Sequence, residues 1–117
     1  MNIKTDVIPK LNELVEQLAP NMPDCVDAVV LFGSYARNEQ SLYSDLDIAI
    51  VRNTANPTRM LEELHVEQTL QDNLTPLEVN VFYTQASKVT MADSPWDTNY
   101  NIRTEGKVLW QSTATSH

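Results

Sequence analysis

The chain has 117 residues, of which 16 are acidic and 8 are lysine or arginine, so its formal net charge at pH 7 is −8. This length fits one domain and is enough to bury an ordinary hydrophobic core. Because proteins grip a nucleic-acid backbone with clustered lysine and arginine, the acidic balance argues against a long nucleic acid as partner. No apolar run approaches the ~20 residues of a membrane span, and the N-terminus lacks a signal-peptide pattern, so we expect a cytoplasmic protein without membrane association.

The first predicted element is an amphipathic helix over residues 6–19. Asp6 is its expected N-cap, and Pro9 is tolerated in the first turn. Pro20 and Pro23 end the helix. The apolar stripe recurs at helical spacing and comprises Ile8, Leu11, Leu14, Val15 and Leu18.

A buried strand is predicted over residues 28–32, and it breaks at Gly33. Residues 34–37 are expected to open a short helix whose free backbone N–H groups face an anion, and Ser34 would add a hydroxyl there. The only cysteine, Cys25, cannot form an internal disulfide. We predict that it is a small packed residue near the start of the strand.

Two aspartates stand at the start of the next predicted strand, residues 47–51, after a polar loop over residues 38–44. Asp45 and Asp47 are separated by one residue, so in an extended strand they point to the same face. Two carboxylates on one face repel each other unless a cation lies between them. The pattern predicts a site for Mg²⁺, a hard ion held by carboxylate and phosphate oxygens.

The second half of the chain predicts further helices and strands. They are a turn over residues 53–57, a helix over 58–72, a strand over 77–82, a helix from Ser94-Pro95 to Thr104 and a strand over 108–110. The third strand has two different faces, one with Leu77, Val79 and Val81 and the other with Glu78, Asn80 and Phe82. We therefore expect an α/β (α+β) fold, a small mixed sheet packed by helices, as a single domain over residues 1–111 with a frayed tail over 112–117.

The pair Gly33-Ser34, ten intervening residues, and Asp45-x-Asp47 between two apolar strands resemble the signature of the minimal nucleotidyltransferase (MNT) family, within the polymerase-beta-like superfamily. The resemblance extends from about Val26 to Trp110. It implies the nucleotidyltransferase fold and Mg²⁺-dependent transfer of a nucleoside monophosphate to a hydroxyl acceptor with release of pyrophosphate. The expected substrate is ATP, which would donate AMP, with another nucleoside triphosphate as the alternative.

The resemblance also implies roles for individual residues. Asp45 and Asp47 would hold one or two Mg²⁺ ions, and Gly33 and Ser34 would cradle the nucleotide phosphates. Arg37 would contact phosphate, with a surface or helix-capping role as the alternative.

In the family, a third carboxylate lies on the strand after the intervening helix. Glu78 is expected to be this third metal ligand and the base that accepts the acceptor's proton, with a solvent-facing edge position as the alternative. Asn80 shares its face and could ligate through its carbonyl oxygen, but it cannot serve as a base.

Asn38 stands where the family most often has glycine, and asparagine tolerates the left-handed backbone better than other non-glycine residues, so we expect the turn to survive. The aromatic residues favour packing over base contacts. We expect Tyr35 and Tyr43 to be packed, Trp96 and Trp110 to lie in the core or an interface, and His65 to be a helix-surface or core residue.

Larger enzymes of the superfamily carry a helical domain over the acceptor, and this chain is too short to supply one, so we expect the acceptor in trans, from another protein or a second subunit. The resemblance suggests an antitoxin paired with a helical HEPN ribonuclease, which it would neutralise by binding or by adding AMP to a tyrosine. Two alternatives are a nucleotide- and partner-binding module without turnover, and a small-molecule adenylyltransferase of the aminoglycoside type.

Overall fold

The computed structural model describes residues 3–113, and the side chains of residues 7–113. The end of the predicted tail, residues 114–117, lies outside the described residues. The elements are α1 (Ile3–Leu18), the 3₁₀ turn η1 (Ala19–Asn21), β1 (Val26–Phe32), β2 (Leu46–Arg52), α2 (Met60–Leu74), β3 (Val79–Gln85), α3 (Ala86–Met91), α4 (Thr98–Glu105) and β4 (Lys107–Gln111).

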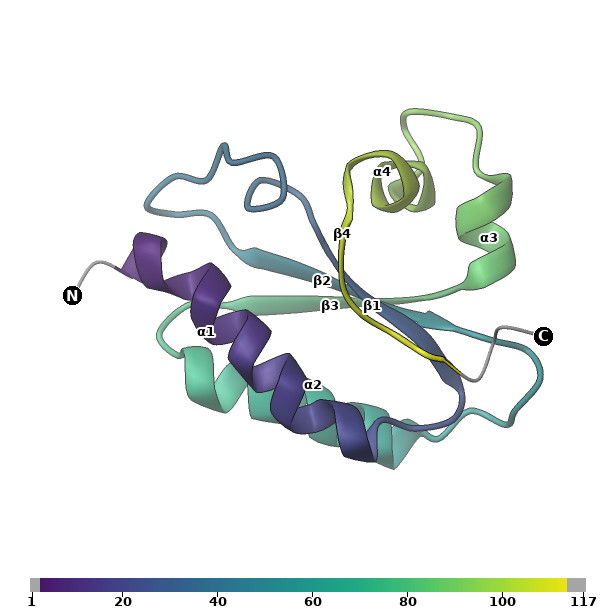
Figure 1. Ribbon diagram of the computed structural model, residues 1–117. Helices are drawn as coiled ribbons and strands as arrows, with labels where there is room; N and C mark the ends of the chain where they lie inside the picture. The colour runs from purple at the N-terminus through teal and green to yellow at the C-terminus, as the bar shows by residue number, and fades with distance from the viewer. Residues whose placement is uncertain (1–2, 114–117) are drawn as a thin grey trace.

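The strands form one mixed sheet in the order β3-β2-β1-β4. Strand β1 runs antiparallel to both β2 and β4, whereas β2 and β3 are parallel. The helices cover the two faces in pairs, α1 and α2 on one side and α3 and α4 on the other (Figure 1). The predicted fold, a small mixed sheet packed by helices, is therefore confirmed.

Alternation along β2 divides its side chains between the two faces. Leu46, Ile48 and Ile50 are buried in the larger core beneath α1 and α2. Ala49 and Val51 belong to the smaller core beneath α3 and α4, which includes Ile102 of α4. Side chains with the same parity as Ala49 therefore face the α3–α4 side of the sheet.

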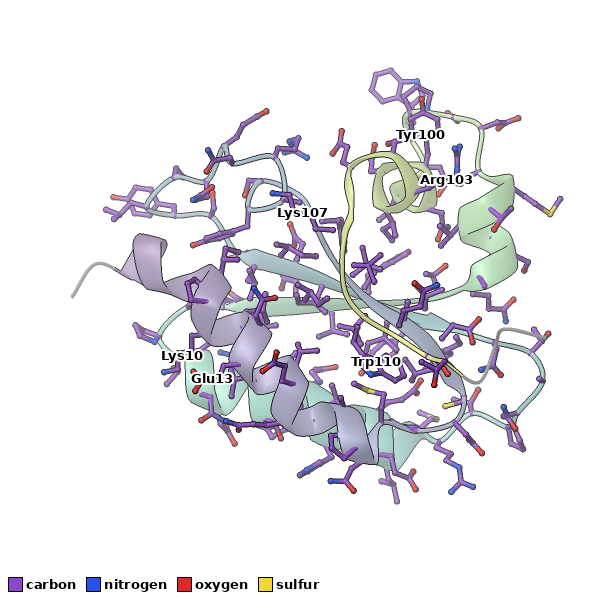
Figure 2. The ribbon with its side chains drawn as sticks, in the orientation of Figure 1. Lys10, Glu13, Tyr100, Arg103, Lys107 and Trp110 are labelled. Carbon is purple, nitrogen blue, oxygen red and sulfur yellow. The ribbon has the colours of Figure 1, made fainter. Side chains whose placement is uncertain are left out.

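The two helical layers lie on opposite faces of the sheet, and an arginine joins the two helices of the α3–α4 layer. Lys10 and Glu13 of α1 lie on the opposite side of the sheet from Tyr100 and Arg103 of α4 (Figure 2). Arg103 donates hydrogen bonds to the carbonyls of Val89 (3.2 Å) and Ala92 (2.6 Å), so it ties α4 to α3. Among the described helices, none is long and apolar enough to cross a membrane.

The helical bounds differ from the sequence prediction for each of the four α-helices. Helix α2 spans Met60–Leu74, so it begins and ends two residues later than the predicted 58–72. Helix α1 begins at Ile3, so Asp6 lies within it and is not its N-cap. Helix α3 had no clear apolar period and was not predicted. The last helix begins at Thr98 because Asp97, its N-cap, accepts a hydrogen bond from the backbone N–H of Asn99 (2.9 Å).

The third strand begins at Val79, two residues later than predicted. The side chain of Gln71 on α2 anchors the start of the strand, because its amide nitrogen donates to the carbonyl of Leu77 (2.8 Å) and its oxygen accepts from the N–H of Val79 (2.9 Å). Both of these backbone groups face the free edge of the sheet, because the carbonyl of Glu78 between them faces β2 and accepts from the N–H of Leu46. Glu78 lies just outside the strand.

Candidate nucleotide and metal site

The turn after β1 is built around Gly33, whose φ of 77° lies in the left-handed region. Its carbonyl accepts hydrogen bonds from the N–H groups of Ala36 and Arg37, both at 3.1 Å. The predicted short helix is therefore a single helical turn. A Cβ at Gly33 would overlap Oδ2 of Asp47, so only glycine lets the turn pack against this carboxylate.

The turn closes through a second left-handed residue. Asn38 has a φ of 59°, which confirms that asparagine preserves the turn at this position. The N–H of Glu39 donates to the carbonyl of Ser34 at 2.9 Å. Within the part of the chain that the structure describes, the hydroxyl and backbone N–H of Ser34 and the backbone N–H of Tyr35 have no hydrogen-bond partner. These donors remain available to an anion.

The aspartates lie beside this turn at the start of β2, with Asp45 just before the strand and Asp47 as its second residue. In the β1–β2 ladder Asp47 is paired with Phe32, the residue before Gly33. In the parallel β2–β3 ladder it is paired with Asn80, so both side chains face the α3–α4 side. The amide nitrogen of Asn80 donates to Oδ2 of Asp45 at 3.1 Å. The structure thus brings both predicted aspartates together with Gly33 and Ser34.

The local charge is unbalanced toward the negative. Burial raises the pKa of Asp47, and the charge of Asp45 adds to this effect, whereas the Asn80 amide and the charge of Arg37 oppose it. Burial also raises the pKa of Tyr35, and Asp45 contributes again. An arrangement that penalises ionised carboxylates is one that a bound cation relieves.

The donor set suits Mg²⁺, which is commonly held by one or two carboxylates together with substrate phosphates and water. Asp45 and Asp47 supply the carboxylates, and the open donors of the Gly33 turn would bind the phosphates. Across the described residues, no group of three or more His, Cys, Asp and Glu side chains is arranged to hold a metal ion. The residues therefore fit an ion that shares its coordination with a nucleotide.

Glu78 lies next to this cluster without joining it. Its carbonyl accepts a hydrogen bond from the N–H of Leu46 at 2.9 Å, which continues the parallel register by one residue and places Glu78 beside Asp45. Its side chain is exposed and has no hydrogen bond or ion pair with another described residue. Its assignment as third ligand and base stays a prediction.

Arg37 points its charge toward α4. Its guanidinium donates to Glu105 at 3.0 Å and lies 3.6 Å from Glu39. The hydrogen bond to Glu105 is the main reason that the pKa of Arg37 is raised. A phosphate contact by Arg37 would have to compete with this carboxylate.

The aromatic residues divide between the core and the surface. Tyr35 is buried and Trp110 packs against the larger core, as predicted. Tyr43 is 89% exposed and Trp96 is 94% exposed, so the packing predicted for Tyr43 and a core position for Trp96 are wrong. Both lie on loops, where no described residue covers them. His65 is on the exposed face of α2.

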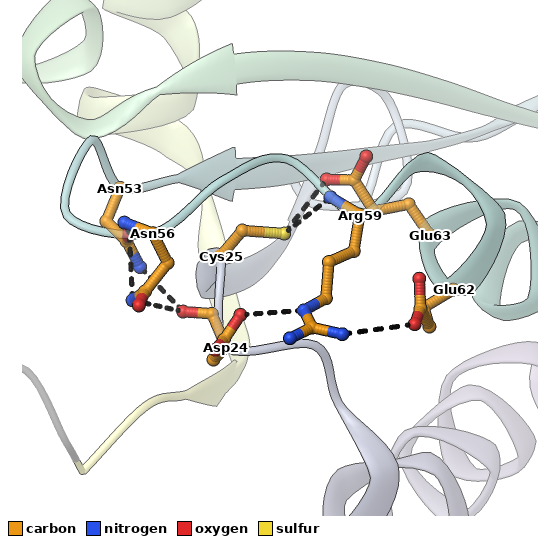
Figure 3. A network of polar contacts seen from close by, with 7 residues as sticks. All are labelled: Asp24, Cys25, Asn53, Asn56, Arg59, Glu62 and Glu63. Carbon is orange, nitrogen blue, oxygen red and sulfur yellow. Dashed lines mark hydrogen bonds and ion pairs between the residues drawn. The ribbon is translucent and has the colours of Figure 1, made fainter.

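A second polar cluster, at the other end of β2, was not predicted from the sequence. Glu63 of α2 is only 1% exposed and accepts two hydrogen bonds from Arg52, both at 2.7 Å. The buried thiol of Cys25, just before β1 as predicted, lies 3.8 Å from Glu63 and accepts from the N–H of Arg59 at 3.4 Å (Figure 3). The spacing of Glu63 with the buried Val66, Leu70 and Leu74 of α2 was the available signal.

Fold and site together define a nucleotidyltransferase, and the comparison with known families agrees. Residues 12–114 match the family described as "Polymerase beta, Nucleotidyltransferase". The chain belongs to this family.

Three solved structures show the same fold. One, from Sulfolobus solfataricus, is described as a candidate nucleotidyltransferase (TM-score 0.55, 16% identity, covering 93% of this chain and 84% of that one). Another is a toxin–antitoxin complex with AMP-PNP, with a TM-score of 0.57 and 23% identity, covering 88% of this chain and 75% of that one. The third is the tri-AMPylated HEPN toxin of Shewanella oneidensis with its MNT antitoxin. Its TM-score is 0.51 and its identity 22%, covering 90% of this chain and 74% of that one. No curated protein gives a significant match.

Proposed function

We propose that this chain binds ATP with Mg²⁺ at the Gly33–Asp47 site and transfers AMP to a hydroxyl group. One observation carries the proposal: the backbone of Gly33 packs against Asp47, with Asp45 two residues earlier, just before the strand, and open N–H donors in the same turn. A phosphate-binding turn and a pair of carboxylates in direct contact are what a metal–nucleotide complex requires.

The residues of the chain divide the work between binding and proton transfer. Ser34 and the free N–H groups of the turn hold the β- and γ-phosphates, and Asp45 with Asp47 would hold the ion. When bound, Mg²⁺ supplies charge neutralisation for the transferring phosphoryl group and the leaving pyrophosphate. We assign Glu78 as the residue that accepts the proton of the acceptor hydroxyl.

The acceptor that we propose is a tyrosine of a helical HEPN-type partner, which would make the chain an antitoxin. The support is the fold shared with the MNT antitoxin that was solved with its tri-AMPylated HEPN toxin. The toxin–antitoxin complex with AMP-PNP adds support for an adenine nucleotide.

The metal–nucleotide part is tested by measuring ATP binding calorimetrically with and without Mg²⁺. We expect Asp45→Asn and Asp47→Asn each to weaken Mg²⁺-dependent binding at least about tenfold. Asp93→Asn removes an exposed carboxylate of the loop after α3 and is the matched control. Equal binding by all four proteins would exclude the site.

The transfer part is tested with radiolabelled ATP and a purified HEPN-type protein. We expect label on the partner with the wild type and none with Asp47→Asn. Glu78→Gln tests the base separately, since transfer that persists at the wild-type rate would remove Glu78 from the reaction.

A further inference from the structure

The position that faces both aspartates from the neighbouring strand belongs to Asn80. Asn80 is the ladder partner of Asp47, and its amide nitrogen lies 3.1 Å from Oδ2 of Asp45. One side chain of β3 thus reaches the two carboxylates that the site is built on. The exposed Glu78, two residues earlier, has no side-chain hydrogen bond or ion pair with another described residue, and no group of three acidic side chains among the described residues is arranged to hold a metal ion.

An amide differs from a carboxylate here in charge and in proton chemistry. Asn80 adds no negative charge, so the side chains facing the site carry two charges and not three. Its Nδ2 group donates one hydrogen bond to Asp45 and thereby uses a lone pair of that carboxylate. Its oxygen can coordinate a cation but does not take up a proton at neutral pH.

The charge count bears on how many ions the site can hold. Two divalent cations ~4 Å apart repel each other strongly, and two-ion sites bridge them with several anionic ligands. Two carboxylates and the nucleotide phosphates suffice for one Mg²⁺, because this ion keeps waters in its remaining positions.

We propose that Asn80 is the third side chain of the site and that it restricts the site to one divalent cation, held by Asp45, Asp47 and the nucleotide. This inference rests on the proposed function, since it concerns the metal–nucleotide complex at the same carboxylates. Asn80 acts as a positioning residue for Asp45, and its position offers no proton acceptor.

The experiment counts bound metal directly. The full chain is dialysed to equilibrium against Mn²⁺ and a non-hydrolysable ATP analogue, and metal and nucleotide per chain are measured for the wild type, Asn80→Asp, Asn80→Ala and Glu78→Gln. Thermal unfolding of each protein verifies that it is folded. Asn80→Asp keeps the shape of the side chain and restores a third charge.

We expect the wild type to bind about one Mn²⁺ per nucleotide, and Asn80→Asp to bind about two, with an overall affinity at least about tenfold higher. Asn80→Ala should weaken binding several-fold, since Asp45 loses its hydrogen bond. Glu78→Gln should match the wild type within about twofold. This pattern supports Asn80 as the third residue.

Two results would overturn the inference while leaving the proposed function intact. One is two Mn²⁺ ions bound by the wild type. The other is weakened binding in Glu78→Gln together with unchanged binding in both Asn80 variants, which would assign the third position to Glu78. A wild type that binds no nucleotide at all would instead overturn the proposed function, and the inference with it.

Discussion

Strand β2 has a charged cluster at each end, and the two clusters are balanced differently. At its last residue, Arg52 forms two hydrogen bonds to the buried Glu63 and stacks 4.7 Å from the centre of the Tyr83 ring. Near its first residue, Asp47 and Asp45 face an amide and an open turn. The first cluster is neutralised within the protein, and the second is not.

We infer from this difference that the Arg52 cluster is structural and that the Asp47 cluster is the proposed ligand site. A buried charge with a bidentate partner is satisfied before any ligand arrives. A pair of half-buried carboxylates whose charge Arg37 offsets only in part opposes folding until a cation binds between them. Changes in the Arg52 cluster should therefore alter the stability of the fold and leave Mg²⁺–ATP affinity unchanged. Changes in the Asp47 cluster should alter Mg²⁺–ATP affinity, and removal of its charge should stabilise the ligand-free protein.

The largest stability effect is expected from Arg52→Met, which leaves the Glu63 carboxylate buried without its partner. Removal of one member of a buried ion pair costs about 3–5 kcal/mol. Because the Arg52 side chain is 25% exposed, water reaching Glu63 should place the loss near the lower end. Urea unfolding measures this loss in the free energy of unfolding. Under conditions in which the variant is folded, its Mg²⁺–ATP affinity should equal that of the wild type.

The double variant Arg52→Met with Glu63→Leu is the control for this prediction. Replacing both charges with apolar groups is often nearly neutral, so most of the lost stability should return. A single variant that unfolds like the wild type would show that the cluster is not structural, and the contrast between the two ends of β2 would fail.

The next largest effect is expected on Mg²⁺–ATP binding, and the only two glycines of the chain provide the comparison. Gly33→Ala places a Cβ against Asp47 at a positive φ, which costs about 1–2 kcal/mol for the backbone alone, and it should abolish measurable Mg²⁺–ATP binding. Gly106→Ala instead meets the carbonyl of Ile102 and a methyl group of Val30, so it should lower stability and spare binding.

Calorimetric ATP titration beside urea unfolding distinguishes the two glycine variants. If Gly106→Ala, still folded, lost binding to the same degree as Gly33→Ala, the turn would have no special part in the site.

Sequence reasoning reached the ligand end of β2 more readily than the structural end. The glycine, the asparagine at position 38 and the two aspartates act through local backbone geometry, namely a left-handed turn and the period of two along a strand. Such constraints depend on neighbouring residues, so the proximity of these residues could be predicted from the sequence.

The contacts that were missed join residues far apart in the sequence. Arg37 reaches Glu105 across 68 positions, and Cys25 lies against Glu63 across 38 positions. No local pattern announces either contact, because each depends on how α2 and α4 pack on the sheet. The sequence also could not show which of Glu78 and Asn80 contacts the aspartates, because both residues lie on one face of the strand.

A smaller effect follows from the pKa of Asp47, which burial raises above its ordinary value of 3.8. A carboxyl with a raised pKa in the folded state stabilises the protein fully below the unfolded pKa, and this contribution is lost as pH rises through the folded pKa. At pH 7 the ionised Asp47 therefore opposes folding, and Asp47→Asn should raise the thermal midpoint without metal.

Thermal unfolding from pH 3 to pH 7 tests this prediction. The difference between variant and wild type should shrink toward pH 3, where Asp47 is protonated in both states of the wild type. Added Mg²⁺ and ATP should stabilise the wild type and not the variant. A variant less stable than the wild type at pH 7 would contradict the view that this end of β2 is uncompensated.

The smallest effect is expected at the junction between the site and α4. Glu105→Gln removes the carboxylate that holds Arg37, and because the pair is exposed to solvent its loss should hardly move the thermal midpoint. Freed from Glu105, Arg37 can turn its charge toward a phosphate, so ATP affinity should rise up to about threefold at low salt and less at high salt. Glu39→Gln, which removes the longer contact at 3.6 Å, is the matched control and should raise affinity less. Unchanged ATP affinity in Glu105→Gln would mean that Arg37 serves the fold alone, and Arg37 would then belong with Arg52 among the charges that are balanced within the protein.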